Sequence, residues 1–156
     1  MRIGHGIDIH SFDENRPLIL GGVTIPYELG LAGHSDADAL THALMDAILG
    51  AAGKPDIGVY FPNTDLRWKG SSSLSLLKIV WEDISKDYSF GNADIAVLLE
   101  QPKLRPHIVA MQENLSEILH VNTNQVNIKA STAEGLGFVG RAEGIYCSAV
   151  VLLNSL

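Results

Sequence analysis

The spacing of apolar positions along the chain predicts strands interrupted by three helices. Apolar residues recur at helical spacing in three segments: about 37–52, 71–86 and 107–120. Four other segments have the alternating or continuous apolar character of strands: 1–9, 92–99, 125–131 and 145–153. Two short β-rich runs flank Gly21-Gly22, and this pattern is typical of a hairpin over residues 17–26.

The pattern predicts a single α+β domain over residues 1–156, because it contains no repeat, low-complexity tract or linker. We expect a mixed four-stranded sheet, a small hairpin, and helices packed on one face of the sheet. The strand at 145–153 is apolar on both faces, which predicts burial on both sides. Residues 53–70 form a long loop, and a functional role is typical of loops of that length.

The amino-acid composition argues against several classes of protein. The chain has 156 residues, of which 18 are acidic and 11 basic, so its formal net charge is −7. This balance argues against a nucleic-acid binder or a basic membrane-surface protein, since both need a cationic face. The single cysteine, Cys147, needs no oxidising compartment, and no signal peptide or apolar run of about 20 residues is present.

Asp8-Ile9-His10 is the first candidate for chemistry. Residues two apart in a strand point to the same face, so Asp8 and His10 can reach one metal ion while Ile9 turns into the core. His42 can supply a third ligand from the first helix. This set suits Zn²⁺ or a similar divalent ion, and three ligands leave a fourth position open. On spacing alone, a polar strand end explains Asp8 and His10 better.

A second candidate is the segment His34 to Asp38, which precedes the first helix. Ser35 or Asp36 is expected to cap the helix. The free N–H groups at the start of the helix suit a phosphate, to which His34 can also donate a hydrogen bond. Asp46 lies four residues after His42, where it either orients that histidine or is an exposed acid. A capping segment with solvated acids is the alternative reading of the whole segment.

The third candidate is Lys129-Ala130-Ser131-Thr132-Ala133-Glu134, where a strand enters a glycine-rich loop. Its hydroxyls and N–H groups can donate to phosphate, and Glu134 can hold Mg²⁺. Without further context, a polar turn is the favoured alternative. Gly135, Gly137 and Gly140 match neither a dinucleotide fingerprint nor a P-loop.

Taken together, these elements resemble the 2-C-methyl-D-erythritol 2,4-cyclodiphosphate synthase family of the non-mevalonate isoprenoid pathway. The resemblance spans nearly the whole chain and is most specific in HSDADALTHALMDAILGAA and KASTAEGLGFVGR. The other matching stretches are MRIGHGIDIH, LILGGVTIP, DIGVYFPNTD, PKLRPHI and the closing apolar strand.

The resemblance implies a homotrimer with active sites between adjacent subunits and Zn²⁺ bound by Asp8, His10 and His42. It implies that 4-diphosphocytidyl-2-C-methyl-D-erythritol 2-phosphate is converted to the cyclic diphosphate and CMP. A bacterial cytoplasm is the expected location, or a plastid-type organelle if a transit peptide has been removed.

The resemblance also implies site residues. His34 and Thr132 are expected to stabilise the transition state, and Glu134 to bind Mg²⁺ or Mn²⁺. The implied substrate-binding positions in the first half of the chain are Asp8, Ile9, His10, His34, Ser35, Asp56, Ile57, Gly58, Phe61, Pro62, Asn63, Thr64 and Asp65. Those in the second half are Leu99, Glu100, Gln101, Pro102, Lys103, Leu104, Arg105, Ala130, Ser131, Thr132, Ala133, Glu134, Phe138 and Arg141.

Phe138, Arg141 and Glu143 match residues around the central channel of the trimer, which in relatives can hold an isoprenoid diphosphate.

Four positions depart from the family pattern. Asn63 stands in place of a common aspartate, Ala37 of a glycine, Ala133 of a hydroxyl residue and Arg105 of an apolar residue. None of the four is an expected zinc ligand.

The residue types fit an intramolecular displacement, because the nucleophile is the substrate's own 2-phosphate and no Ser-His-Asp or Cys-His pair is present. Two other functions remain open at this point. One is a zinc hydrolase that uses metal-bound water. The other is a trimeric module that binds a metal or an isoprenoid diphosphate without catalysis.

Overall fold

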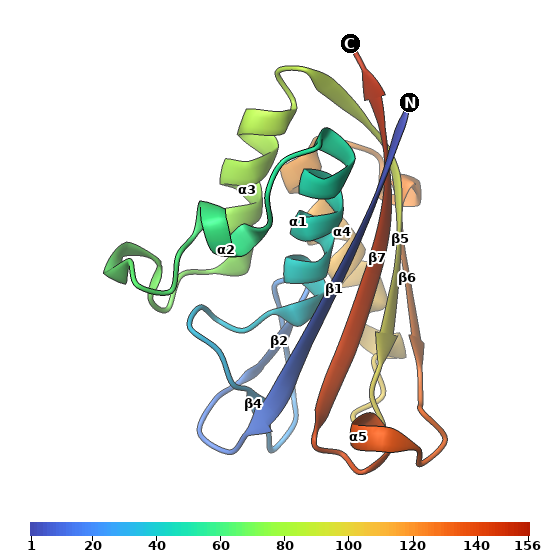
Figure 1. The fold of residues 1–156 in the computed structure, drawn as a ribbon. Helices are drawn as coiled ribbons and strands as arrows, with labels where there is room; N and C mark the ends of the chain where they lie inside the picture. The colour runs from blue at the N-terminus through green and yellow to red at the C-terminus, as the bar shows by residue number, and fades with distance from the viewer.

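The computed structural model describes residues 1–156 and contains one five-stranded sheet and a two-stranded hairpin (Figure 1). The large sheet has the order β4-β1-β7-β5-β6. Its strands are β1 (Arg2–Asp13), β4 (Gly30–Leu31), β5 (Tyr88–Leu98), β6 (Val126–Ser131) and β7 (Gly144–Ser155), and the hairpin is β2 (Leu18–Leu20) with β3 (Val23–Ile25). The helices are α1 (Ala39–Ala52), α2 (Ile57–Tyr60), α3 (Ser73–Ile84), α4 (Ile108–Leu119) and α5 (Gly137–Gly140), with 3₁₀ turns η1 (Leu66–Trp68), η2 (Arg105–His107) and η3 (Thr123–Gln125).

The three long helices, α1, α3 and α4, cover one face of the sheet (Figure 1). Strand β5 pairs with β6 in parallel because α4 returns the chain between them, whereas β1, β7 and β5 pair antiparallel. The predicted mixed α+β architecture is therefore confirmed. The fifth strand, β4, has only two residues and lies between the hairpin and the first helix, where no strand was predicted.

Glycines decide which face of β1 meets the core. A Cβ at Gly4 would lie 1.8 Å from the carbonyl oxygen of Ala47, and a Cβ at Gly6 would lie 2.1 Å from that of Ala43. Strand and helix backbones touch here, which only glycine permits. Ile9 lies on the opposite face and is 53% exposed, so the expectation that Ile9 turns into the core is wrong.

Burial alternates along β7, so the prediction of burial on both sides is also wrong for the single chain. Val150 is 45% exposed on the outer face of the sheet. The inward residues are fully buried: Ile145, Cys147, Ala149, Val151 and Leu153. The outer face of β1 and β7 is uncovered, and Ile3, Ile7 and Val150 are exposed on it beside the polar pair His5 and Ser148.

Asp38, rather than Ser35 or Asp36, caps α1. Its carboxylate accepts from the N–H of Thr41 at 3.0 Å, and it also accepts from the N–H groups of Gly21 and Gly22 at 3.0 and 2.8 Å. Asp38 is fully buried, and burial raises the pKa of its carboxyl, although these donors favour the ionised form. The Asp38 carboxylate therefore already satisfies the N–H of Thr41, one of the free donors that the sequence predicts at this helix start.

Two expected loops contain short elements. Residues 53–70 include α2 and η1, and the glycine-rich loop includes α5. Strand β5 begins at Tyr88 rather than 92 and has a bulge between Phe90 and Asn92. Phe90 remains buried there because its ring packs edge-on against Trp81 with centroids 5.8 Å apart.

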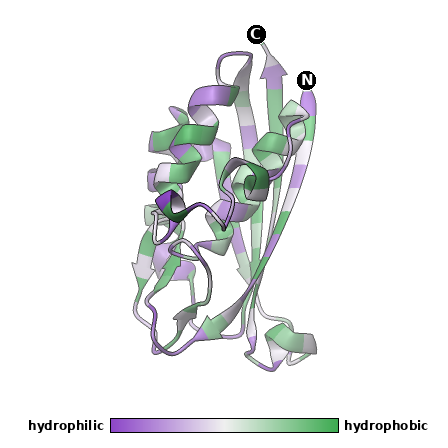
Figure 2. Ribbon diagram, turned by 60° about the vertical axis from the view of Figure 1, so that its left-hand side comes forward, coloured by the Kyte–Doolittle hydropathy of each residue, from purple (hydrophilic) through white to green (hydrophobic).

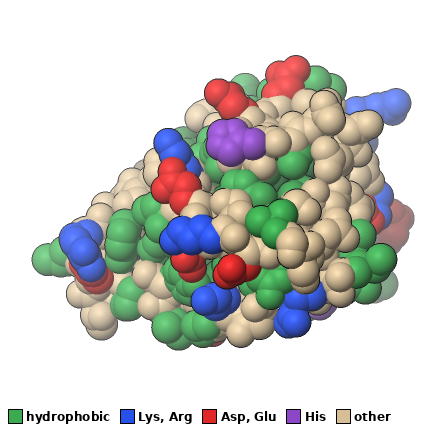
Figure 3. All heavy atoms as spheres, turned by 90° about the horizontal axis from the view of Figure 1, so that it is seen from above, with side chains coloured by type: hydrophobic (Ala, Val, Ile, Leu, Met, Phe, Trp, Pro, Cys, Tyr) green, Lys and Arg blue, Asp and Glu red, His purple; other side chains and the backbone are tan.

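On the face seen from above, acidic and basic side chains are interspersed, and no broad area carries one sign of charge (Figure 3). Apolar and polar segments alternate along the helices and strands (Figure 2). None of the helices combines the length and hydrophobicity that a membrane span requires.

Candidate metal centre and ligand pockets

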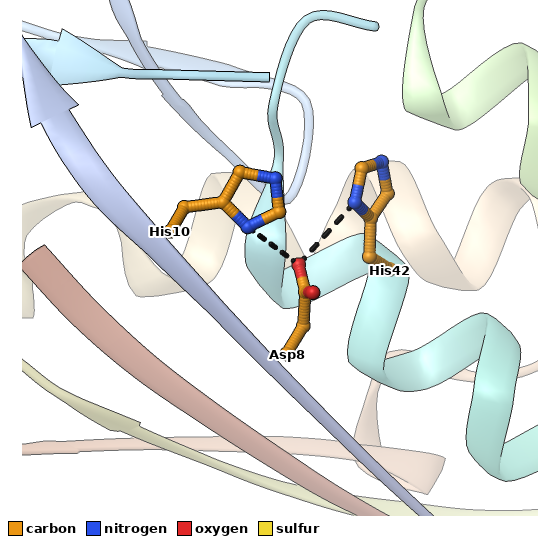
Figure 4. A group of neighbouring side chains, drawn as sticks. All are labelled: Asp8, His10 and His42. Atoms are coloured by element: carbon orange, nitrogen blue, oxygen red, sulfur yellow. Dashed lines mark ion pairs between the residues drawn. The ribbon is translucent and has the colours of Figure 1, made fainter. Parts of the chain in front are cut away.

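Asp8, His10 and His42 converge where β1 crosses α1 (Figure 4). Asp8 and His10 share the inward face of β1 with Gly6, so close strand–helix contact brings both toward His42. Asp8 Oδ2 lies 2.8 Å from His10 Nδ1 and 3.3 Å from His42 Nδ1. The triad that the sequence indicates is thus assembled by the fold.

Burial and charge act against each other at this cluster. Burial alone raises the pKa of the Asp8 carboxyl, but the contacts with His10 and His42 outweigh burial and hold that pKa below its usual value. Burial alone lowers the pKa of His42, but the contact with Asp8 outweighs it and raises that pKa. The cluster therefore stabilises a positive charge beside a carboxylate.

The geometry fits a divalent cation. The three ligand atoms lie within 4.8 Å of one another, and Asp8 Oδ2 and His10 Nδ1 are buried without a hydrogen bond of good geometry. Ligands about 2.0–2.1 Å from a tetrahedral zinc ion lie about 3.3 Å apart, similar to the Asp8–His42 separation. Oxygen and imidazole donors with an open side are typical of a catalytic site.

Two serines contact the Nε2 side of the His42 ring, opposite the Nδ1 atom that faces Asp8. Its Nε2 lies 2.9 Å from Ser73 Oγ on α3 and 3.1 Å from Ser35 Oγ. Ser73 in turn binds the carboxylate of Asp36 through both its hydroxyl and its N–H. Ser72 occupies the N-cap position of α3 but makes no side-chain cap hydrogen bond, and the Asp36 carboxylate instead accepts from the N–H of Ser73 in the first turn.

A pocket of about 270 Å³ opens beside the cluster. Its lining brings together much of the predicted first-half site: His10, Gly33, His34, Ser35, His42, Ile57, Gly58, Phe61, Asn63, Trp68 and Leu76. His34 Nε2 is buried there without a hydrogen-bond partner. The Arg16 guanidinium donates to the carbonyl oxygens of Gly33 and Ser35 and so fixes the backbone on both sides of His34.

Asp46 has neither of the roles expected for it. Its carboxylate accepts from the N–H of Ile57 at 2.8 Å and makes no hydrogen bond with His42. It is half-buried, and burial raises the pKa of its carboxyl. Asp46 therefore attaches α2 to α1 and places Ile57 and Gly58 on the pocket wall.

Four predicted positions of this region lie outside the pocket lining: Asp56, Pro62, Thr64 and Asp65. Asp56 caps α2 by accepting from the N–H of Val59 at 3.2 Å. Asp65 is paired with Arg67 at 2.6 Å. These residues border the pocket from the same loop.

A second pocket, of about 510 Å³, lies between the β5–α4 connection and the end of β6. The predicted segments 99–105 and 130–132 meet here, and the lining is Leu99, Glu100, Pro102, Lys103, Leu104, Arg105, Ile108, Lys129, Ala130, Ser131 and Thr132. Glu100 Oε1 accepts from the N–H of Ala133 at 2.9 Å and joins the two segments. Gln101, Ala133 and Glu134 adjoin this pocket without lining it.

The two pockets share no lining residue. Ile9 faces the outer side of the sheet, Phe138 lies in α5, and Arg141 pairs with Glu143 at 2.9 Å on the surface. Within one chain, the predicted site residues are therefore divided between separate places.

The structure adds lining residues that the sequence analysis does not single out: Gly33, Trp68 and Leu76 in the first pocket and Ile108 in the second. Leu76 and Ile108 lie on apolar helix faces, where periodicity alone indicates core. The aromatic content of residues 53–70 is the one signal that points to Trp68.

Comparison with known proteins identifies similar chains. A sequence model of the YgbB family matches residues 1–154. A 2-C-methyl-D-erythritol 2,4-cyclodiphosphate synthase from Geotalea uraniireducens (strain Rf4) is 54% identical over 155 residues, which are 99% of each chain.

Solved structures share the fold. The bifunctional IspDF from Campylobacter jejuni matches with a TM-score of 0.95 and 44% identity, and the match covers 99% of this chain but only 42% of that longer one. A complex of IspF from Plasmodium falciparum with CDP matches with a TM-score of 0.86 and 37% identity over 99% of this chain and 96% of that one.

Proposed function

The chain belongs to the YgbB family, and from this membership we propose that it is a 2-C-methyl-D-erythritol 2,4-cyclodiphosphate synthase of non-mevalonate isoprenoid biosynthesis. It converts 4-diphosphocytidyl-2-C-methyl-D-erythritol 2-phosphate to the cyclic diphosphate and releases CMP. The observation that carries this conclusion is the Asp8–His10–His42 cluster beside a pocket, in a chain 54% identical to a synthase along its whole length.

Asp8, His10 and His42 would hold Zn²⁺, and Glu134 would hold Mg²⁺ or Mn²⁺ with the substrate diphosphate. Such ions supply Lewis-acid stabilisation of charge on phosphate oxygens. The fit rests on the donor types and on the buried, unsatisfied atoms of Asp8 and His10. Thr132 donates to Glu134 at 2.6 Å, which holds that carboxylate at the edge of the second pocket.

The remaining residues position the substrate. His34 and Ser35 face the first pocket, where they can donate to the 2-phosphate and the methylerythritol end. Lys103 and Thr132 line the second pocket, which suits a cytidine diphosphate, the nucleotide named in the Plasmodium falciparum complex. Because the nucleophile is a phosphate of the substrate, holding it in line with the diphosphate supplies most of the rate enhancement.

We propose that the enzyme is a homotrimer whose sites form between subunits. The two half-sites lie in separate pockets of one chain, so a neighbouring copy is needed to bring them together. The outer face of β1 and β7, where Ile3, Ile7 and Val150 are exposed, offers the surface for that contact. Phe138, Arg141 and Glu143 would then surround the central channel, which an isoprenoid diphosphate would fit.

We expect Ile7→Glu to dissociate this assembly, because it places a charge on the outer face where Ile7 is 46% exposed. Sedimentation should give a trimer for the unmodified protein and a monomer with much reduced activity for the variant. Val109→Glu is the matched control, since Val109 is 63% exposed on α4, away from that face. A fully active monomer would contradict the shared site.

Incubation with the cytidine-linked substrate and Mg²⁺ tests the function directly. Mass analysis should find the cyclic diphosphate and CMP in equal amounts. Ring-opened products would instead indicate a hydrolase, and the absence of turnover in a metal-loaded trimer would indicate a binding module.

A further inference from the structure

The hydrogen bonds behind His42 have only one consistent direction. The Ser73 hydroxyl has a single proton, and the short contact with Asp36 Oδ1 requires it, because a carboxylate can only accept. Ser73 Oγ, 2.9 Å from His42 Nε2, must therefore accept from that nitrogen. It follows that Nε2 carries a proton and that Nδ1, which faces Asp8, is the ring nitrogen free to bind a metal.

We propose that Asp36 and Ser73 are positioning residues that hold His42 as the Nε2–H tautomer and present its Nδ1 to the metal. The proposal rests on the proposed metal centre and deepens it. A histidine ligand is oriented by the acceptor that its second nitrogen meets, and here the acceptor is a serine backed by a carboxylate. Neither Asp36 nor Ser73 itself lines the pocket.

The hydrogen-bonded series Asp36–Ser73–His42, which we call the relay, is supported by further hydrogen bonds. Ser73 is fully buried, and its N–H donates to Asp36 Oδ2 at 2.9 Å. Asp36 is fixed at its backbone, where its N–H donates to the carbonyl of Ser71 at 3.1 Å, and its side chain also accepts from the N–H of Asp38. These bonds join the loop before α1 to the start of α3, so His42 is oriented by two elements distant in sequence.

A second consequence concerns Ser35. Its Oγ lies 3.1 Å from the same Nε2 and also accepts from the N–H of Ala37 at 3.2 Å. Because Nε2 is protonated and directs its one proton to Ser73, it has no lone pair to accept from Ser35, so the Ser35 hydroxyl proton is free to be donated into the pocket that it lines. The relay thus sets the hydrogen-bonding role of a pocket residue as well as that of the ligand.

Zinc binding without substrate tests the relay. In Ser73→Ala we expect zinc affinity, measured by competition with a chromophoric chelator, to fall about 10- to 100-fold, the usual effect of losing such a partner. Ser72→Ala is the control, because Ser72 is exposed and makes no side-chain cap bond. Equal zinc affinity in Ser73→Ala and the unmodified protein would overturn the proposal.

Nitrogen-15 NMR of the imidazoles provides a measurement that does not depend on a variant. The zinc-loaded protein should show a protonated Nε2 and a metal-bound Nδ1 at His42. Zinc on Nε2, or no zinc binding at all, would overturn the relay. If zinc binds through Nδ1 and the cytidine-linked substrate is not turned over, the proposed function fails while the relay stands.

Discussion

His42→Ala is expected to abolish metal binding and lower turnover about a thousandfold or more, because Lewis-acid stabilisation is worth several kcal/mol. His42 supplies one of three converging donors, and two remaining donors leave Asp8 and His10 with a weak bidentate site. The metal content of the purified variant and the rate of CMP release should both fall, while circular dichroism shows the fold retained.

His120→Asn is a suitable control for this loss. His120 is exposed at the end of α4 with a φ of 56°, a conformation that asparagine tolerates, and it lies outside both pockets. Its metal content and activity should match those of the unmodified protein. Full activity in a metal-free His42→Ala protein would refute the proposed role of the centre.

Gly6→Ala is expected to lower the free energy of unfolding by about 3 kcal/mol, the upper range for overpacking. The added Cβ would lie 2.1 Å from the Ala43 carbonyl oxygen and 2.6 Å from the Ala47 backbone nitrogen. Neither backbone atom can move alone, so β1 must separate from α1. Because Asp8 and His42 lie on those two elements, metal affinity should fall together with stability.

Gly50→Ala tests the same strand–helix interface, but here we expect the free energy of unfolding to rise rather than fall. Its Cβ would have no neighbour nearer than 3.9 Å, so the substitution should raise the free energy of unfolding by about 0.5–1 kcal/mol through helix propensity. Urea unfolding measures both variants. A stable Gly6→Ala protein with normal metal affinity would show that the close contact does not position the centre.

The periodicity of apolar residues was sufficient to predict the helix and sheet layers of this fold. An amphipathic helix and a half-buried strand each have a characteristic period that can be read directly from the sequence. The same rule placed Asp8 and His10 on one strand face, but spacing alone favoured a polar strand end, and the family resemblance indicated that they join His42 as metal ligands. The segments 99–105 and 130–132 were grouped through the family resemblance, and the structure places them around one pocket.

Where the prediction failed, a long-range contact decided the outcome. Ile9 is apolar, but Gly4 and Gly6 bring the opposite face of β1 against α1, so Ile9 faces outward. Asp38 caps α1 because the hairpin donates the N–H groups of Gly21 and Gly22 to the same carboxylate. Local propensity does not include a partner that is 16 or 17 positions away in the chain.

The sequence by itself determined the class of fold, the family and the three side chains of the candidate metal centre, because these depend on local periods and contiguous motifs. Only the tertiary structure decided how the site is oriented. Ser73 lies 31 positions from His42, yet its hydroxyl sets which nitrogen of that ring faces Asp8. The direction of a hydrogen bond depends on where donors and acceptors meet in space, and that is set by packing rather than by spacing along the chain.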